Sequence, residues 1–455
     1  MSTYNSSYRV REKREGYYLR HACRIFIGVL FIFSAYVKGV DPFGFSLKIE
    51  EYFLSWGMDF MLPLAQFTAC CMLLAEFLIG VAMLFNIQVR FFSWILLLFM
   101  LFFLVLTAYL AFITGIVAFI NRMAGTAYQV FVPSDCGCFG DFIKLTNMQT
   151  FWKNVIFMLP TLVIFAQRKN FKTTPFHYIT EWGPLLLATL FMVFMQVHCL
   201  RHEPWHDFRP WNKGHFIAAE TYSAPPEVDY LFRYRHIQTK ELKEITMDEL
   251  MRITEDSAES AGFEQNYVYV DRVEKVLKAG IDAKLSDFTM LNAETLEDEK
   301  LSYIESPGYH FLMIDRDISK SDWRYVEEMN RFALRCKETG IPFVAVTSSL
   351  PDKVALMQDS LRLCFPFYYS DATPLKTALR NNLGLLLLKD GYILDKWSFR
   401  DLPDFDEFQA YQAKYEASLE KYRLKNPPVL PNGDTLELKN GVEPSADAET
   451  LSGNE

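Results

Sequence analysis

The sequence lacks most of the short motifs by which catalytic sites are recognised. It has no internal repeat, no Walker phosphate loop, no dinucleotide fingerprint and no H-E-x-x-H motif. Nucleotide hydrolysis and zinc proteolysis therefore have no support in the sequence. It also has no C-x-x-C pair among its 8 cysteines, so the dithiol that many redox proteins carry is missing.

The chain also lacks a basic surface suited to nucleic acid, and its formal net charge is −9. Basic residues cluster only at the start of the chain and after its fourth apolar run. They are Arg9, Arg11, Lys13, Arg14, Arg20 and Arg24, followed much later by Arg168, Lys169 and Lys172. Membrane topology and contact with anionic lipid account for such clusters. We therefore expect membrane lipid as a partner and no nucleic acid.

Long apolar runs are what the sequence has instead. Mean hydropathy is only +0.04 although 51% of the residues are hydrophobic, because the apolar residues gather before about residue 200. A bilayer core about 30 Å thick is crossed by about 20 mostly apolar residues. The runs that meet or approach this length are 20–40, 62–85, 91–119, 154–166 and 182–200.

The fourth run is the shortest and reaches spanning length only if its helix begins near Thr146. Thr146-x-x-Gln149 has the form of a capping box, and Pro160 should kink the helix. Core helices of a soluble protein are the alternative to spans, but 91–119 carries no charged residue. A cleavable signal peptide is disfavoured for the first run, because Lys38 stands where small residues should mark a cleavage site.

The basic clusters also give an orientation, since Lys and Arg of short loops stay on the cytoplasmic side. The N-terminus is then cytoplasmic, and five crossings place loops 41–61 and 120–150, with everything after about 201, on the far side. We expect a multi-pass protein of a bacterial inner (plasma) membrane. Its C-terminal domain is expected to be periplasmic or extracellular.

One loop on that far side holds Cys136-Gly137-Cys138. A C-x-C pair can close a small disulfide ring, and Gly137 allows the bend. Strained exposed disulfides are oxidising, so the two cysteines form a candidate redox pair. A static loop staple and a metal site remain open, the latter because His198, Cys199, His202 and His206 gather on the same side. Asp135 and Asp141 flank the pair and should raise the thiol pKa values, opposed in sequence only by Lys144.

The other cysteines have weaker settings. Cys199, at the outer end of the last span, is a candidate resolving thiol, although a packing role competes with it. Cys336 and Cys364, in the soluble part, either pair or remain free thiols. Three charged residues lie within spans: Glu76, Arg24 and Lys38. An ionised group at such a depth marks a functional or paired site, and we expect Arg24 to reach Glu76 unless the carboxyl stays protonated.

Taken together, several positions resemble the bacterial DoxX/MauE family of membrane proteins over residues 18–200. They are Arg24-x-x-x-Gly28-x-x-Phe31-x-x-Ser34-x-x-x-Lys38-x-x-Asp41-Pro42, Glu76-x-x-x-Gly80, and Asp135 to Asp141 followed by Lys144-Leu145-Thr146. The resemblance implies a four-helix core, distantly similar to the vitamin K epoxide reductase type, and a role in disulfide formation or membrane redox chemistry. MauE is associated with maturation of a disulfide-rich methylamine dehydrogenase.

The resemblance implies an extracytoplasmic protein partner with cysteines, and it leaves a quinone cofactor open. The chain departs from the vitamin K reductase pattern, which has a C-x-x-C in its bundle. A complete quinone-coupled relay within this chain is therefore doubtful.

Residues 281–422 show strands and helices in the order of a thioredoxin-like domain. Apolar strand runs at 311–314 and 343–346 alternate with helical patterns, and two strands joined at Asp390-Gly391 precede a closing helix at 404–421. The loop 315–321, where the dithiol of a catalytic thioredoxin would lie, contains no cysteine, and 381–383 lacks the expected cis-proline. This domain should not exchange disulfides by itself.

The sequence thus predicts an α-helical membrane bundle of four core helices plus a fifth, followed by an α/β thioredoxin-like extracytoplasmic domain. The expected division is a cytoplasmic N-terminus 1–19, the bundle 20–200, an interfacial segment with a linker or small α/β region 201–280 that is helical near 240–254, the domain 281–422 and a disordered tail 423–455. The predicted function is a thiol-disulfide oxidoreductase component acting through Cys136 and Cys138. The alternative is a non-enzymatic scaffold or small-molecule-binding bundle.

Overall fold

The fold is taken from a computed structural model of the chain. It describes residues 16–429 except 134, 141, 144, 172–177, 223–225, 256, 279, 282, 284 and 286. The predictions for Asp141 and Lys144 and for most of the tail 423–455 therefore fall outside the described residues, as does nearly all of the expected cytoplasmic N-terminus.

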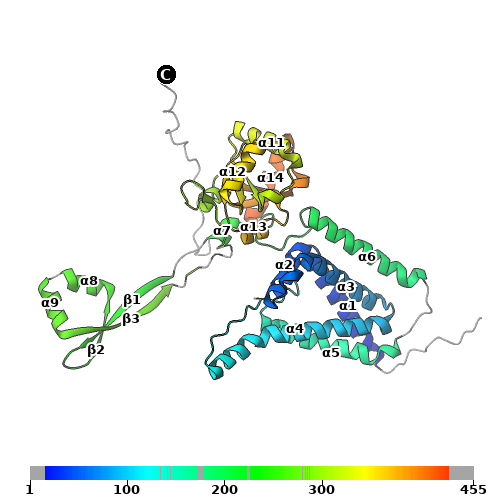
Figure 1. The fold of residues 1–455 in the computed structure, drawn as a ribbon, viewed down its shortest axis with the longest axis horizontal. Coiled ribbons are helices and arrows are strands. Elements are labelled where there is room, and N and C mark those ends of the chain that lie inside the picture. The colour runs from blue at the N-terminus through cyan, green and yellow to red at the C-terminus, as the bar shows by residue number, and fades with distance from the viewer. Residues whose placement is uncertain are drawn as a thin grey trace, which may run out of the picture.

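The N-terminal half is a bundle of long apolar helices (Figure 1). The helices are α1 (Tyr17–Gly39), α3 (Ala65–Phe85) preceded by η1 (Asp59–Leu64), α4 (Val89–Ala124), α5 (Asn147–Ala166) and α6 (Tyr178–Arg201). Among the described residues, five helices have the length and composition to cross a membrane. The predicted spans are confirmed at this level. A short turn, η2 (Arg168–Asn170), follows α5.

The start of α5 confirms the capping box. Thr146 Oγ1 accepts a hydrogen bond from the backbone of Gln149, and Gln149 Oε1 accepts one from the backbone of Thr146. Two donors that would otherwise be unpaired at the helix start are thereby satisfied. Because of this cap, α5 begins at Asn147, seven residues before its strongly apolar run, and reaches spanning length.

Helices α1 and α3 cross at two glycines. A Cβ atom on Gly28 would lie 2.8 Å from the backbone nitrogen of Leu84, and one on Gly80 would lie 2.8 Å from that of Ile32. Neither position has space for a side chain, so the two backbones meet directly, as small residues allow in membrane bundles. This packing accounts for Gly28 and Gly80 of the family-like pattern.

The segment between the first two spans contains a helix that the sequence analysis missed. Helix α2 (Pro42–Ser55) occupies most of the segment expected to be a loop at 41–61. Asp41 caps it by accepting from the backbone of Gly44, and Pro42 stands in its first turn, where a missing N–H costs nothing. Its residues Phe45, Ile49 and Phe53 are buried in the bundle core.

The C-terminal half contains a six-stranded sheet of order β4-β7-β6-β5-β8-β9. Its strands are β4 (Leu291–Asn292), β5 (Tyr309–Asp315), β6 (Phe343–Thr347), β7 (Phe367–Tyr369), β8 (Leu383–Lys389) and β9 (Tyr392–Ser398). Strands β5, β6 and β7 are parallel, and β8 and β9 are antiparallel. The central strands are almost wholly buried, which explains their continuous apolar runs.

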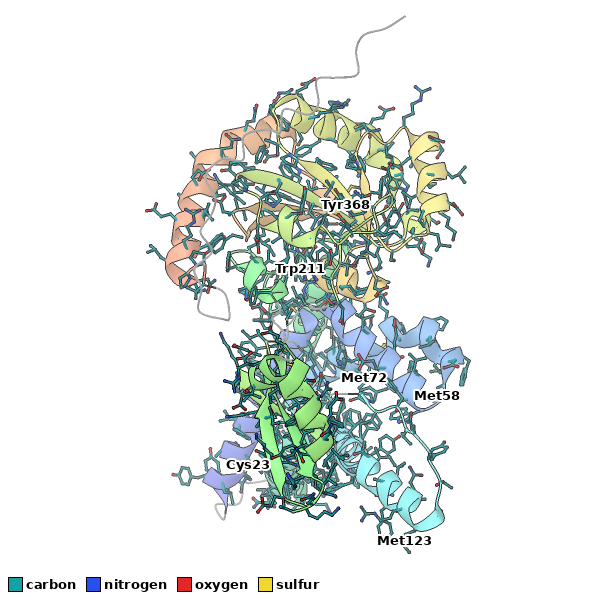
Figure 2. The ribbon with its side chains drawn as sticks, turned by 90° about the vertical axis from the view of Figure 1, so that its left-hand side faces the viewer. Cys23, Met58, Met72, Met123, Trp211 and Tyr368 are labelled. Atoms are coloured by element: carbon teal, nitrogen blue, oxygen red, sulfur yellow. The ribbon has the colours of Figure 1, made fainter. Side chains whose placement is uncertain are left out.

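Helices and turns surround this sheet. They are α7 (Ile217–Thr221), α10 (Lys300–Ile304), η3 (Ile318–Lys320), η4 (Trp323–Tyr325), α11 (Val326–Glu338), α12 (Pro351–Leu361), α13 (Ala372–Ala378), η5 (Phe399–Asp401) and α14 (Phe405–Lys425). Trp211 and Ile217 lie fully buried in the same core, so this core includes part of the segment predicted to be an interfacial anchor and linker. Figure 2 shows Trp211 at the base of the α/β domain.

Between the two halves an arm projects from the chain (Figure 1). A three-stranded sheet of order β2-β1-β3 forms it, with β1 (Glu227–His236), β2 (Leu242–Thr246), α8 (Met247–Glu255), α9 (Ser257–Asn266) and β3 (Tyr267–Lys278). The prediction of helix at 240–254 is wrong for 242–246, which pair with β1 as a strand. Cross-strand pairing overrides the local preference for helix there.

Candidate functional site

The loop between α4 and α5 holds Cys136 and Cys138 in a tight turn. Gly137 and Gly140 have φ angles of +65° and +53°, and the backbone of Gly140 donates to the carbonyl of Gly137 over 3.1 Å. Left-handed angles of this kind favour glycine. Ser34 of α1 donates to the Cys138 carbonyl over 2.9 Å and thereby fixes the turn against the bundle.

The two cysteine sulfur atoms lie 3.1 Å apart, and both side chains are free thiols. This separation is within hydrogen-bond distance and only about 1 Å longer than a disulfide bond. Cys136 is 3% exposed, whereas Cys138 is partly exposed. The spacing therefore suits an exchange between dithiol and disulfide with little movement of the loop.

The two thiols have opposite pKa shifts. The hydrogen bond between the two thiols, followed by the positive charges of Lys153 and Lys38, lowers the pKa of Cys138 to about 6 against the effect of burial. The same hydrogen bond and burial raise the pKa of Cys136 well above its ordinary value. The arrangement resembles a thiolate stabilised by a neighbouring thiol, which makes Cys138 the better nucleophile.

The expectation that flanking aspartates raise both thiol pKa values is wrong for Cys138. Asp135 is turned away, because its carboxylate accepts from the backbone of Gly137 and pairs with Lys48 of α2 over 3.4 Å. Cations from α1 and α5 outweigh it. Asp141 lies outside the described residues.

Lys153 is the site residue that sequence reasoning missed. It lies in the second turn of α5, where its ammonium group is 4.6 Å from the ring centre of Phe139 and hydrogen-bonds to Cys138. The sequence does contain a signal, because a lysine inside a membrane helix is costly and by default functional. The pattern hides this signal, because the apolar run itself begins only at residue 154.

The charged residues within the spans form other contacts than predicted. Lys38 of α1 pairs with Glu76 of α3, and both side chains are buried. Arg24 instead donates to the carbonyls of Met83 and Leu84, so the predicted contact between Arg24 and Glu76 is wrong. The reason is register: Lys38 lies opposite Glu76 on the facing helix, whereas Arg24 lies near the C-terminal end of α3.

A cavity of about 50 Å³ connects the ion pair with the thiols. Its lining includes Cys136, Cys138, Lys38, Glu76 and Lys153, together with aromatic residues of α1, α4 and α5. Such a volume accommodates a few water molecules. The sulfur of Cys138 therefore faces polar, ionisable groups inside the bundle.

The opposite side of the same loop faces a second, larger cleft of about 230 Å³. Gly137 and Gly140 line one wall, Lys48 of α2 another, and the segment 206–209 closes it. Tyr52, also on α2, directs its hydroxyl toward Cys136, and burial raises the pKa of this phenol so that it stays a donor. The loop thus separates an outer cleft from an inner cavity.

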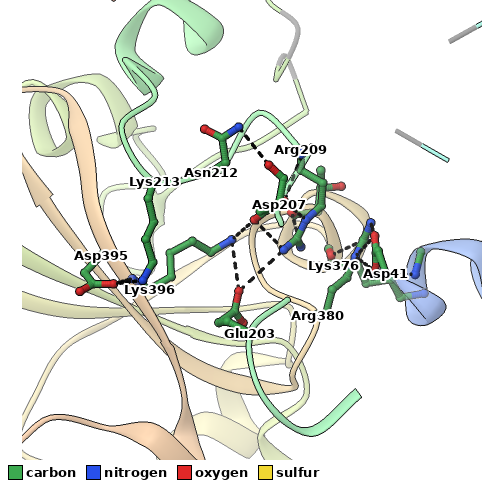
Figure 3. Close-up of polar contacts among 12 residues, drawn as sticks. Asp41, Glu203, Asp207, Arg209, Asn212, Lys213, Lys376, Arg380, Asp395 and Lys396 are labelled. Atoms are coloured by element: carbon green, nitrogen blue, oxygen red, sulfur yellow. Dashed lines mark hydrogen bonds and ion pairs between the residues drawn. The ribbon is translucent and has the colours of Figure 1, made fainter. Parts of the chain in front are cut away.

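A buried network of charges joins the bundle to the α/β domain beside this cleft (Figure 3). Arg380 donates to both carboxylate oxygens of Asp41 over 2.6–2.9 Å. Arg209 pairs with Asp207 over 2.7 Å, and Lys396 pairs with Asp207 over 2.8 Å. Burial would raise the pKa of Asp207, but Arg209 and Lys396 hold it well below its usual range.

The remaining predicted cysteines and histidines are linked to neither Cys136 nor Cys138 by a hydrogen bond or ion pair among the described residues. Cys199 is buried in the apolar cluster that also contains Cys136, and its role as a resolving thiol stays a prediction. Cys336 is buried and Cys364 exposed, and both are free thiols. His202 pairs with Asp401 over 2.8 Å. Within the described ranges, no group of three or more His, Cys, Asp or Glu residues gathers as a metal site.

Comparison with known proteins gives one result. The model of a family described as "Methylamine utilisation protein MauE" matches residues 17–167. No curated protein and no solved structure matches the chain. The matched range contains α1 to α5 and the loop with Cys136 and Cys138. Over residues 17–167 the chain is therefore similar to the MauE family, and its five long apolar helices are those of a multi-pass membrane protein.

Proposed function

We propose that this protein is a membrane thiol-disulfide oxidoreductase in which Cys138 is the nucleophile and Cys136 the resolving thiol. The observation that carries the proposal is the pair of sulfur atoms 3.1 Å apart with oppositely shifted pKa values. A reactive dithiol needs one thiolate near neutral pH and a second thiol close enough to displace it.

The proposed reaction is disulfide exchange with an extracytoplasmic partner protein. The Cys138 thiolate attacks one sulfur of the partner disulfide, forms a mixed disulfide and releases the other partner sulfur as a thiolate. Cys136 then loses its proton and attacks Cys138, which releases the second partner thiol and leaves a Cys136–Cys138 disulfide. Two electrons pass to the partner, and the reverse sequence oxidises a partner dithiol.

The position of the loop between two hollows supports a relay across the membrane surface. The outer cleft of about 230 Å³ offers a partner access to the loop, and the inner cavity exposes Cys138 to Lys38, Glu76 and Lys153. Because the chain has no C-x-x-C pair to complete a relay by itself, we propose that a separate lipid-soluble carrier of the quinone class closes the cycle by gaining or losing two electrons and two protons. The proposal places the loop on the extracytoplasmic side of a bacterial inner membrane.

The α/β domain belongs to the same proposal as a thioredoxin-like scaffold that docks the partner. Its sheet order, with parallel β6-β5 flanked by the antiparallel hairpin β8-β9, supports this assignment. No cysteine stands in the loop after β5, so electron transfer is left to Cys136 and Cys138.

Trapping the mixed disulfide tests the proposed roles. Cys136→Ser should accumulate disulfide-linked adducts through Cys138 in cells, detected on non-reducing gels with mass spectrometry. Cys138→Ser should form few, because the remaining thiol of Cys136 is only 3% exposed. Equal trapping by both variants, or by neither, would refute the assignment.

The second candidate is a non-enzymatic bundle in which the cysteine pair only shapes the loop. The deep burial of Cys136 and the bond from Ser34 to the Cys138 carbonyl favour it. This reading expects the Cys136→Ser/Cys138→Ser double variant to keep full function in cells. Loss of function in either single variant excludes it.

A further inference from the structure

The loop after β5 has a built structure although it lacks a dithiol. Asn382, at the start of β8, holds it from both sides: its amide donates to the carbonyl of Asp317 over 2.8 Å and accepts from the backbone of Asp317 over 3.0 Å. The same amide donates to Ser321 over 2.7 Å. This loop follows the carboxyl end of a parallel strand, which is where α/β folds bind ligands.

An open cleft of about 520 Å³ lies at this end of β5 and β6. Four cationic side chains line it, namely Arg316, Lys320, Lys353 and Lys376. Asp317 is the one carboxylate in its described lining, and it pairs with Lys320 over 3.0 Å. Four positive charges less one negative charge leave the cleft with a net charge of +3. Such an excess attracts an anion.

Of these four cations, Arg316 gives the strongest indication of a bound anion. Its Nη1 atom is buried and has no hydrogen-bond partner among the described residues. The guanidinium lies 5.2 Å from the ring centre of Phe43 in the bundle, and both burial and nearby Arg380 lower its pKa. A buried donor without an acceptor is costly, and an anion in the cleft would supply the acceptor.

One serine hydroxyl at the same strand ends adds a neutral donor. Ser349 Oγ accepts from the backbone of Ile318 over 3.0 Å, which leaves its own hydrogen available to a ligand. Ser348 instead donates its hydrogen to the Arg316 carbonyl over 2.6 Å and thereby holds the loop in place. Charged and neutral donors converging on one cleft are typical of sites for oxyanions.

We propose that this cleft binds a phosphate group at the junction of the α/β domain and the membrane bundle. A dianion with several acceptor oxygens matches the net charge of +3 and the number of converging donors. The phosphate belongs either to a small soluble compound or to an anionic lipid headgroup, since Phe43 of the bundle forms part of the wall. The site is independent of the proposed thiol chemistry.

The test uses the full chain in maltoside micelles, which contain no phosphate. Thermal unfolding is followed by tryptophan fluorescence while inorganic phosphate is titrated against chloride at equal ionic strength, and then with phosphatidylglycerol added instead. Arg316→Gln removes the buried donor, and Lys320→Gln/Lys376→Gln removes two positive charges without altering the core. Arg331→Gln, an exposed arginine on α11, is the matched control.

A saturable rise of the unfolding temperature with phosphate supports the soluble source, and a rise with phosphatidylglycerol alone supports the lipid source. In either case Arg316→Gln should raise the apparent dissociation constant of the ligand by about tenfold or more, because a hydrogen bond to a charged group is lost. The double lysine variant should raise this constant as well, and Arg331→Gln should leave it unchanged. No stabilisation beyond chloride, or equal stabilisation in all variants, would overturn the proposal.

Discussion

Cys138 and Cys136 carry the same side chain but meet different surroundings. Cys138 shares a hydrogen bond with Cys136 and lies in the field of two lysines, from α1 and α5, whereas Cys136 is more deeply buried. Their roles can therefore be distinguished by the pH at which each thiol reacts.

Alkylation of Cys138 should follow the thiolate fraction. Because its pKa is lowered to about 6, the rate should rise as pH increases through 6 and level off near neutrality. Lys153→Met should shift this midpoint upward by about one unit or more, because a nearby cation is lost. The rate is measured by mass spectrometry with a maleimide.

Lys169→Met, at the opposite end of α5, is the control for charge removal and should leave the midpoint in place. A midpoint near the ordinary thiol pKa in the unaltered protein would contradict the proposed thiolate, whatever the variants do.

At the scale of single residues, the sequence identifies the thiols and the buried charges but not their partners. Cys136, Cys138, Glu76 and Lys38 stand out by type and position. That Lys38 and not Arg24 pairs with Glu76 depends on how two helices are registered in space, which no spacing within either helix reveals. The pKa prediction from the flanking aspartates failed because the fold, and not the spacing along the chain, decides which charges face the thiols.

At the scale of elements, hydropathy predicts the long helices well. Each span is continuous in sequence, and the length needed to cross a bilayer is fixed. Helix α2 was missed because its apolar residues are too few for a span, and its start depends on the cap from Asp41. Strand β2 was missed because its pairing with β1 lies outside the local pattern.

Gly80 gives a test of the helix crossing. Gly80→Val should destabilise the bundle by about 2 kcal/mol or more, because the added atoms overlap the backbone of α1 and the helices must move apart. The unfolding temperature in micelles reports the loss.

Gly115→Val is the matched control, since a Cβ atom there meets nothing within 4 Å. It should leave the unfolding temperature nearly unchanged. An equal loss in both variants would mean that helix propensity, and not the crossing of α1 and α3, sets the effect.

At the scale of the whole molecule, a buried ion pair joins segments that are far apart in sequence. Asp41 stands at the start of α2 and Arg380 shortly before β8, so only the folded chain brings them together. The sequence predicts both halves separately, but the surface where they meet depends on two folds being formed first. Figure 1 shows the α/β domain placed beside α2.

Arg380→Gln should weaken the contact between the bundle and the α/β domain. Removing one partner of a buried pair leaves the other unpaired and costs about 3 kcal/mol, so amides of α2 should exchange hydrogen faster. Arg335→Gln breaks an exposed pair with Asp406 and should have little effect. Hydrogen–deuterium exchange of residues 42–55 distinguishes the two variants.

The ion pair between Asp41 and Arg380 should be sensitive to acid. Burial would raise the pKa of Asp41, but Arg380 and Arg209 lower it below its ordinary value. A lowered carboxyl pKa stabilises the docked state fully above pH of about 4, and the stabilisation is lost as pH falls further. Protection of the α2 amides that stays constant in this range, after correction for the pH dependence of the intrinsic exchange rate, would argue against the ion pair.

The central claim is that Cys136 and Cys138 interconvert between dithiol and disulfide. The most direct measurement is differential alkylation of the two residues in isolated membranes, equilibrated with thiol redox buffers of graded potential and read by mass spectrometry. The account predicts one reversible two-electron transition in which both cysteines change together, near the potential of the extracytoplasmic compartment. A pair that stays oxidised under strong reduction, or reduced throughout, would contradict it and leave the loop with a structural role.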